Sequence, residues 1–220
     1  MADKVQLTID FPSRIATMLS GDEIDLGLVP VAIIPQLKEY YIISDYCISC
    51  DGAVASVCLF SEVPLEKVER ILLDYQSKTS VELLKILARD FWKVTPEFEN
   101  GTGEYQSRIQ GSTAALLIGD RALIQRHRSK YIFDLGLEWK KFTGLPFVFA
   151  AWISNKPLAA DFVSEFNQAN AWGLARVDSV ISRYDTNYVN LKEYYGNFIK
   201  FTMTPEKQLA LESFLRIIQR

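Results

Sequence analysis

The stretch ILLDYQSKTSVELLKILARDFW, residues 71–92, contains the local pattern from which the rest of the chain can be understood. It opens with a short apolar run of strand type and continues through polar residues without periodicity. Apolar residues then recur at helical spacing from Val81 to Phe91. Thr79, with Glu82 three residues later, fits a capping box and predicts the start of a helix. The stretch therefore predicts a strand, a polar loop and a helix.

The loop before this helix is suited to an anion. A helix N-terminus presents unpaired backbone N–H groups and the positive end of the helix dipole, which together favour a carboxylate or a phosphate. Ser77, Thr79 and Ser80 add hydroxyl groups at the same place. The glycines of a nucleotide-binding P-loop are absent upstream, which argues against a nucleotide. An ordinary connection, in which the hydroxyls only cap the helix, remains the competing interpretation.

Composition narrows the class of protein. The 220 residues are 49% hydrophobic and 23% charged, which is ordinary globular composition. A net charge of −3 without a basic cluster argues against a nucleic-acid partner. No apolar run approaches the roughly 18 residues of a membrane span, and the start lacks the apolar segment of a signal peptide. Three cysteines, an odd number, indicate a reducing compartment rather than a disulfide framework.

Strands and helices alternate along the chain, which predicts an α/β protein with parallel sheets. The expected strands are 4–10, 23–29, 40–44, 53–61, 71–73, 114–118, 131–135 and 145–154. The expected helices are 14–19, 31–37, the one after residue 79, 121–126, 137–143, one opened by Asn155 and Pro157, 191–195 and one opened by Thr204-Pro205.

Two long apolar strands, 53–61 and 145–154, bracket the middle of the chain. If both run between two lobes, residues 64–144 form one lobe, and residues 1–63 and 145–220 together form the other. Ligands of open α/β sheets sit outside the carboxyl ends of the strands. That rule places Val29-Pro30, the 77–80 loop and Gly119-Asp120 at one cleft.

The remaining motifs predict neither a metal nor a cofactor. Cys47 and Cys50 form a CxxC pair without a second pair, so buried reduced thiols are the simpler interpretation. The single histidine, His127, lies in a basic, surface-like stretch. Phe147, Phe149 and Trp152 could line an apolar pocket, although core packing is the default for such residues. From residues alone, the prediction is a two-lobed α/β binding fold without an obvious catalytic group.

Several segments, taken in order, closely resemble the menaquinone-biosynthesis family of the futalosine pathway. The resemblance covers almost the whole chain and is weakest after about Asp178. Within the family, the member that dehydrates chorismate is a closer match than the sister member that forms dihydroxynaphthoate. The segments are 23–31 (EIDLGLVPV), 45–48 (DYCI), 51–57 (DGAVASV), 77–85 (SKTSVELLK), 117–120 (LIGD), 134–140 (DLGLEWK) and 143–147 (TGLPF).

The resemblance implies a type II periplasmic-binding-protein-like fold, with a ligand cleft between two α/β lobes. It also implies a cytoplasmic, cofactor-free lyase that removes water from chorismate to give 3-[(1-carboxyvinyl)oxy]benzoate. Family members begin with an extra strand and helix, and that strand carries a Ser-Tyr-x-Asn segment whose asparagine reaches the cleft. No position here matches that segment, and residues 5–10 look like the family's second strand. We therefore expect this chain to lack the family's N-terminal strand.

Chorismate carries two carboxylates and a hydroxyl leaving group, and this chemistry assigns expected roles at the cleft. Ser77, Thr79 and Ser80 would take one carboxylate, and Ser56 would be a second polar contact. Gly119 would allow close approach of the backbone, with Asp120 at the opposite rim. The three aromatic residues Phe147, Phe149 and Trp152 would sandwich the ring.

The catalytic base is not identified by the sequence. Asp120 is a weak candidate, because an unpaired carboxylate would repel a dianionic substrate. Our hypothesis is that the substrate's own enolpyruvyl carboxylate takes the ring proton. Two other functions stay open: a non-catalytic carboxylate-binding protein of the same fold, and the sister dihydroxynaphthoate-forming reaction. The sequence also leaves a homodimer open.

Overall fold

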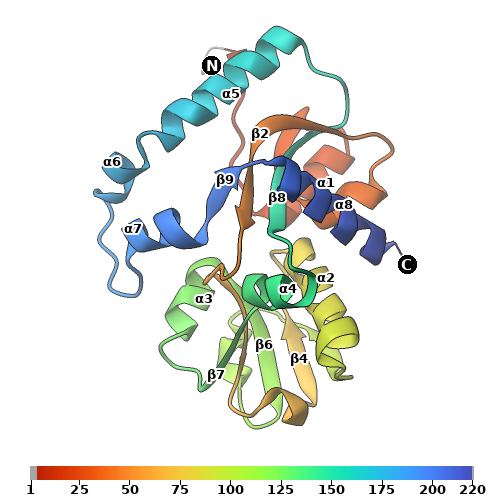
Figure 1. Cartoon of the computed structure of the whole chain (residues 1–220), viewed down its shortest axis with the longest axis vertical. Coiled ribbons are helices and arrows are strands. Elements are labelled where there is room, and N and C mark those ends of the chain that lie inside the picture. Colours follow the sequence, from red (N-terminus) through yellow and green to blue (C-terminus); the bar gives the residue numbers. More distant parts are fainter. Residues whose placement is uncertain (1–3, 220) are drawn as a thin grey trace.

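Two β-sheets, one above the other in Figure 1, organise the chain. The computed structural model describes residues 4–219. One sheet has four strands in the order β1-β8-β2-β9, and the other has five in the order β5-β4-β6-β3-β7. Each sheet with its helices forms one lobe of a mixed α/β protein, as the sequence predicts.

The first sheet is built around β8, a continuous apolar strand that is buried along nearly all of its length. It pairs antiparallel with both β1 and β2, and β2 pairs antiparallel with β9. The strands are β1 (Leu26–Pro30), β2 (Tyr41–Cys50), β8 (Phe147–Ser154) and β9 (Lys200–Thr202). The helices of this lobe are α1 (Pro12–Ser20), the 3₁₀-helix η2 (Val31–Gln36) and α8 (Pro205–Ile218).

The second sheet is mixed. Strand β4 pairs parallel with β5 and β6, whereas β3 pairs antiparallel with β6 and β7. Its strands are β3 (Val57–Ser61), β4 (Arg70–Leu73), β5 (Glu97–Asn100), β6 (Thr113–Ile118) and β7 (Tyr131–Asp134). Its helices are η3 (Leu65–Lys67), α2 (Lys78–Ile86), the π-helical turn η4 (Leu87–Trp92), η5 (Tyr105–Arg108), α3 (Gly119–Gln125) and α4 (Leu135–Thr143).

The expectation of parallel sheets is therefore wrong for most pairings. In the second sheet, the physical reason lies in β3, which enters that sheet from the first lobe. It must run away from the point of entry, while its neighbours β6 and β7 run towards it. Its place beside β6 and β7 also corrects the lobe boundary: Val57–Ser61 belongs to the second sheet, so the chain crosses between lobes at 51–56 rather than at residue 63. Residues 1–3 and 220, which the predicted lobes include, lie outside the described residues.

The expected strand at 4–10 is not formed. Residues 5–10 form no regular secondary structure and pair with no strand among the described residues, and Leu7 and Ile9 are 76% and 86% exposed. A strand needs a partner for its backbone N–H and C=O groups, and none lies beside this segment. The alternating apolar pattern alone therefore does not make it a strand.

The segment after β8 forms an outer arm of helices, which Figure 1 shows along one side of the molecule. The first helix begins at Ala160 rather than near Asn155, and none of its residues is fully buried. Trp172 of this helix is 63% exposed. The arm comprises α5 (Ala160–Leu174), α6 (Val177–Ile181), α7 (Leu191–Glu193) and the π-helical turn η6 (Tyr194–Phe198).

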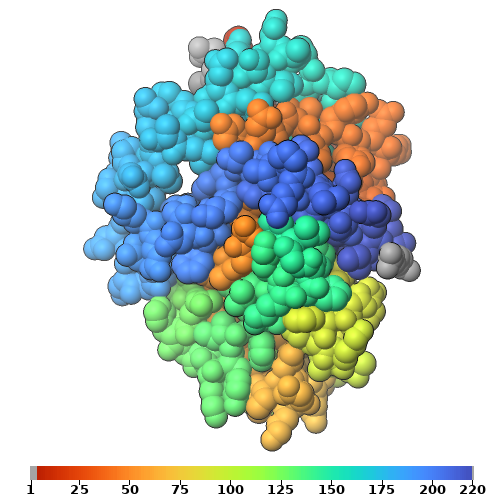
Figure 2. Space-filling view, viewed as in Figure 1, coloured from red at the N-terminus to blue at the C-terminus, as the bar shows by residue number. Residues whose placement is uncertain are grey.

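Helix α4 connects the hydrophobic cores of the two lobes. Its Trp139 is fully buried and packs edge-on against Phe147 of β8 and Phe214 of α8, with ring centroids 5.2 and 6.1 Å away. In Figure 2 the residues of α4 lie below the blue C-terminal residues, which belong to the first lobe, and above the residues of the second lobe. Such edge-to-face contacts add stabilisation beyond area burial.

Two helical glycines give a matched test of this packing. A Cβ at Gly136 of α4 would lie 2.5 Å from Cys50 Sγ and 2.6 Å from the Gly52 carbonyl oxygen, whereas a Cβ at Gly173 of α5 meets nothing within 4 Å. We expect Gly136→Ala to lower the free energy of unfolding by about 1–3 kcal/mol through overpacking. Gly173→Ala should raise it by up to about 1 kcal/mol through helix propensity. Urea unfolding of both variants checks this, and equal shifts would show that α4 does not pack as described.

Candidate functional site

The polar residues predicted as a site gather where the two lobes meet. The carboxyl ends of β4 and β6 and the start of β3 lie at the same edge of the second sheet. The segments 53–56, 74–80 and 119–120 leave from that edge. We call these segments, with Val31-Ala32 of the first lobe, the lobe junction.

Ser56 and Gly119 are both predicted as substrate contacts, with Gly119-Asp120 at the opposite rim of the cleft, but the two residues are in direct contact. The Gly119 backbone N–H donates to the Ser56 carbonyl oxygen at 2.8 Å. Gly119 has a φ of 60°, which glycine adopts without the steric cost of a side chain. Asp120 follows on the first turn of α3 and is exposed. These three predicted residues are therefore brought together.

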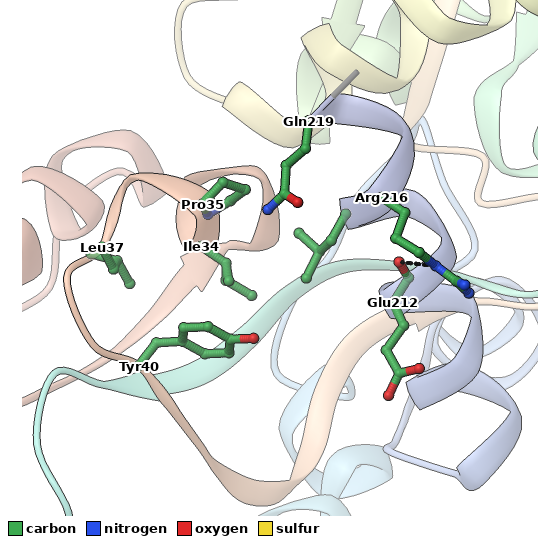
Figure 3. Close-up of a pocket in the computed structure, with 8 residues that line it drawn as sticks. Ile34, Pro35, Leu37, Tyr40, Glu212, Arg216 and Gln219 are labelled. Atoms are coloured by element: carbon green, nitrogen blue, oxygen red, sulfur yellow. Dashed lines mark hydrogen bonds between the residues drawn. The ribbon is translucent and has the colours of Figure 1, made fainter.

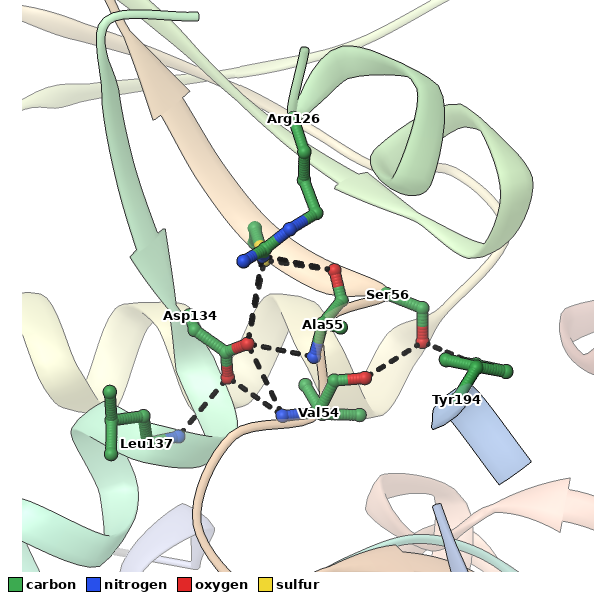
Figure 4. A network of polar contacts seen from close by, with 8 residues as sticks. Val54, Ala55, Ser56, Arg126, Asp134, Leu137 and Tyr194 are labelled. Atoms are coloured by element: carbon green, nitrogen blue, oxygen red, sulfur yellow. Dashed lines mark hydrogen bonds and ion pairs between the residues drawn. The ribbon is translucent and has the colours of Figure 1, made fainter. Parts of the chain in front are cut away.

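The corner before Ser56 is held by a residue that the sequence predictions missed. Ala55 has a φ of 61°, an uncommon conformation for a residue other than glycine. The Asp134 carboxylate accepts hydrogen bonds from the backbone N–H of Val54 at 3.0 Å and of Ala55 at 2.7 Å (Figure 4). It also accepts from the Leu137 N–H at 3.1 Å and so caps α4. The signal for the cap was an aspartate before an apolar helix; nothing local indicated the bonds to 54–55.

Tyr194 is a second residue that the sequence predictions missed. Its hydroxyl donates to Ser56 Oγ at 2.7 Å, from the π-helical turn η6 of the other lobe (Figure 4). The contact joins residues 138 positions apart, and no local pattern distinguishes Tyr194 from the other tyrosines.

The N-terminus of α2 differs from the predicted capping box. The N-cap residue is Ser77, whose Oγ accepts from the Ser80 N–H at 3.2 Å, so the pairing of Thr79 with Glu82 is wrong. The Ser77 and Ser80 hydroxyls lie 2.8 Å apart. Thr79 is fully buried, and its Oγ1 accepts from the Ala32 N–H at 3.1 Å across the lobe junction.

These bonds change what α2 can offer a ligand. The hydroxyls of Thr79 and Ser80 are buried and engaged, contrary to the expectation that they would hold a carboxylate. Among residues 4–219, no acceptor pairs with the backbone N–H groups of Lys78 and Thr79. Ser77 is half-buried beside them. The anion-binding capacity of this helix end therefore lies in its backbone and in Ser77.

Arg121 fixes the loop after β4 to the start of α3. Its Nη2 donates to Asp74 Oδ2 at 2.7 Å and to Gln76 Oε1 at 2.9 Å. The Tyr105 hydroxyl donates to the same Asp74 oxygen at 2.7 Å, and the guanidinium lies over the rings of Tyr75 and Tyr105. Burial raises the pKa of Tyr105, chiefly by disfavouring the phenolate. The 74–77 and 119–121 segments thus form one rigid edge of the lobe junction.

The three aromatic residues of β8 do not form one wall. Phe147 and Phe149 are buried and stack edge-on with each other at 4.7 Å, in the core with Trp139. Trp152 contacts Phe166 of α5 instead. Because alternate residues of a strand point to opposite faces, positions 147 and 152 cannot face one ligand. The predicted ring sandwich is therefore corrected.

Residues 1–220 match the model of a protein family described as menaquinone biosynthesis. The chain belongs to this family. It is 27% identical to the chorismate dehydratase of Thermus thermophilus, over 92% of this chain and 83% of the relative.

Solved structures confirm the fold of this menaquinone-biosynthesis family member. A protein from Archaeoglobus fulgidus matches with a TM-score of 0.69 at 16% identity, over 97% of this chain and 85% of its own. The periplasmic aliphatic sulphonate binding protein of Escherichia coli matches with a TM-score of 0.54 at 13% identity, over 95% and 79%. The fold is periplasmic-binding-protein-like, as the sequence predicts.

Other reactive groups of this family member lie apart from the lobe junction or are buried. Cys47, Cys50 and Cys58 are free and buried, and burial raises the pKa of all three thiols. His127 is exposed, with Nε2 2.9 Å from the Tyr188 carbonyl oxygen. Within residues 4–219, no three acidic, histidine or cysteine side chains cluster in a way that would hold a metal. Over the same residues, no helix combines the length and apolarity needed to cross a bilayer.

Two surface pockets lie away from the predicted site residues. One, of about 440 Å³, separates Ile34 and Tyr40 on one side from Arg216 and Gln219 of the C-terminal region on the other (Figure 3). The second, of about 640 Å³, borders α6, α7 and η6 and is lined by Tyr195 among others. Neither pocket is lined by a residue that the sequence predicted as part of the substrate site.

The Thr79 bond gives a test of the lobe junction. Thr79→Val keeps the shape of the side chain but leaves the buried Ala32 N–H without an acceptor, so we expect a loss of about 1–3 kcal/mol in the free energy of unfolding. Thr79→Ser keeps the hydroxyl and is the control for side-chain changes at this position. Urea unfolding of both variants measures the difference. If both unfold like the wild type, the bond across the lobes does not form in solution.

Proposed function

We propose that this chain is a chorismate dehydratase, removing water from chorismate to give 3-[(1-carboxyvinyl)oxy]benzoate in the futalosine route of menaquinone biosynthesis. The observation that carries the proposal is the set of neutral hydrogen-bond donors at the lobe junction. Strands β3, β6 and β4 are neighbours, so Ser56 and the loop after β4 lie about 10 Å apart, two strand spacings. That separation suits a ring compound with a carboxylate at each side. Family membership and the similarity to a chorismate dehydratase support the same substrate.

In this proposal each donor has a partner on the substrate. Ser77 and the backbone N–H groups of Lys78 and Thr79 bind one carboxylate, aided by the positive end of the α2 dipole. Ser56 donates to the second carboxylate or to the leaving hydroxyl. Gly119 lets the substrate approach the backbone closely. The ligand is a small dianion, and the protein acts in the cytoplasm.

The reaction asks little of the protein. One C–O bond and one C–H bond on adjacent ring carbons break; the hydroxyl and the proton leave as water, and the ring becomes aromatic. Aromatisation supplies the driving force, so the protein has to bind two anions, exclude water and hold the reacting groups in line. The donors described above do this without a covalent intermediate.

The ring proton passes, in our proposal, to the substrate's own enolpyruvyl carboxylate. Asp120 is exposed, and its negative charge beside a dianionic substrate would oppose binding. His127 is exposed, and its Nε2 lies within hydrogen-bond distance, 2.9 Å, of the Tyr188 carbonyl oxygen. A substrate-supplied base needs only positioning from the protein, which is what the lobe junction can provide.

Incubation of the purified protein with chorismate tests the proposal directly. We expect an aromatic product to appear by absorbance, with loss of one water confirmed by mass spectrometry. Ser56→Ala is the comparison variant and should form product more slowly. Wild-type protein that forms no product at high enzyme concentration would contradict the proposal.

A non-catalytic carboxylate-binding protein is the second candidate. It is favoured by the likeness in fold to a sulphonate binding protein and by the engagement of the Thr79 and Ser80 hydroxyls within the protein. Calorimetry with chorismate separates the two candidates. Binding without product formation favours the binding protein.

Asp120→Asn tests the source of the base. Removing a general base costs about 10²- to 10⁴-fold in rate. We expect kcat to stay within about tenfold of wild type and KM to fall, because a repulsive charge is lost. A loss of two or more orders of magnitude in kcat with unchanged binding would instead assign Asp120 as the base.

A further inference from the structure

Tyr194 forms a hydrogen bond with Ser56 and has no role in the proposed function described above. We propose that Tyr194 is a positioning residue that orients the Ser56 hydroxyl so that its hydrogen is presented to the bound substrate. The inference rests on the proposed function in one respect: chorismate is taken as the ligand of Ser56.

The contact is short and comes from the opposite lobe. The Tyr194 hydroxyl lies 2.7 Å from Ser56 Oγ. Tyr194 stands in η6, directly before β9 of the first sheet, whereas Ser56 stands directly before β3 of the second. Single π-helical turns occur often at functional sites. Here the turn brings a tyrosine from one lobe onto a serine of the other.

The direction of the hydrogen bond leaves Ser56 with a hydrogen to donate. Tyr194 donates to Ser56 Oγ, so the serine's own hydrogen needs a different acceptor. Among the described residues the other oxygen near Ser56 Oγ is the Val54 carbonyl, at 3.5 Å, which is long for an O–H···O bond. A carboxylate or hydroxyl oxygen of a ligand would be a better acceptor. Tyr194 thus favours the orientation of the Ser56 hydroxyl in which its hydrogen points towards the ligand.

The ionisation of Tyr194 agrees with this role. Burial raises the pKa of Tyr194 to about 12, with the hydrogen bond to Ser56 acting in the opposite direction. The phenol therefore stays protonated near neutral pH and can act as the donor. An ionised phenolate would instead accept from Ser56 and take the hydrogen away from the substrate.

Both partners are held firmly on their own side. The Ser56 corner is fixed by Asp134 through the backbone of Val54 and Ala55. The Tyr194 ring lies edge-on to Tyr195 at 5.1 Å, and Tyr195 stacks on Phe201 of β9 at 6.2 Å. A fixed donor facing a fixed acceptor is the arrangement expected of preorganisation rather than of a surface contact.

A double-mutant cycle tests the inference in the full-length protein. Tyr194→Phe removes only the hydroxyl, and we expect kcat to fall about 3- to 10-fold with a smaller change in KM, the effect of one neutral hydrogen bond. Ser56→Ala should cost more. In the Ser56→Ala background, Tyr194→Phe should have no further effect on kcat, because its partner is gone.

Tyr195→Phe is the matched control. Tyr195 is the adjacent residue of the same turn and lines the outer pocket, and its hydroxyl makes no hydrogen bond to the described residues. We expect wild-type kcat and KM from this variant. Thermal unfolding of each variant is measured alongside, so that a general loosening of η6 is seen as a loss of stability.

The outcomes separate this inference from the proposed function. If product forms and the effects of Tyr194→Phe and Ser56→Ala multiply independently, Tyr194 does not act through Ser56 and the inference fails alone. If the wild type binds chorismate without turnover, the proposed function fails. The double-mutant cycle of Tyr194→Phe and Ser56→Ala is then measured with the dissociation constants of chorismate in place of kcat. Coupling in that cycle supports the inference and independent effects overturn it. Wild-type protein that neither converts nor binds chorismate overturns both.

Discussion

The carboxylate of Asp134 is the interaction on which the lobe junction depends. It accepts from three backbone N–H groups, those of Val54, Ala55 and Leu137. Hydrogen bonds to an ionised acceptor are stronger than neutral ones, which is how the left-handed conformation of Ala55 can be sustained. One side chain thereby sets the angle at which β3 enters the second sheet, the start of α4 and the position of Ser56.

The consequence of that entry extends through α4 into the first lobe. Because α4 starts at Asp134, its Trp139 comes to lie against Phe147 and Phe214 of the other lobe. The bond between Thr79 and Ala32 joins the lobes at a second place. Together these contacts hold Ser56 and the N-terminus of α2 at the same edge of the second sheet. The local sequence around Ser56 does not indicate that α2 lies near it, and the local sequence of α2 does not indicate Ser56.

Local patterns predicted much of this fold, and non-local contacts account for what they missed. The strand, loop and helix of 71–92 follow from spacing alone, as β4 and α2 show. Residues 5–10 have an equally good strand pattern but no partner, and partnership is a property of the whole chain. The opposite directions of Phe147 and Trp152 were readable from strand alternation, whereas the bond of Tyr194 to Ser56 spans 138 positions and leaves no sequence signal.

The charges at the lobe junction explain why a binding fold can serve an elimination reaction. Two buried carboxylates at the junction are already hydrogen-bonded within the protein. Asp134 accepts from backbone N–H groups, and Asp74 accepts from Arg121 and Tyr105. Besides the exposed side chains of Lys78 and Asp120, what remains towards a ligand is a set of neutral donors, which attract a dianion. A substrate that brings its own carboxylate to its own ring proton needs no more than this. The same neutralisation that stabilises the junction therefore favours positioning over acid–base catalysis by the protein.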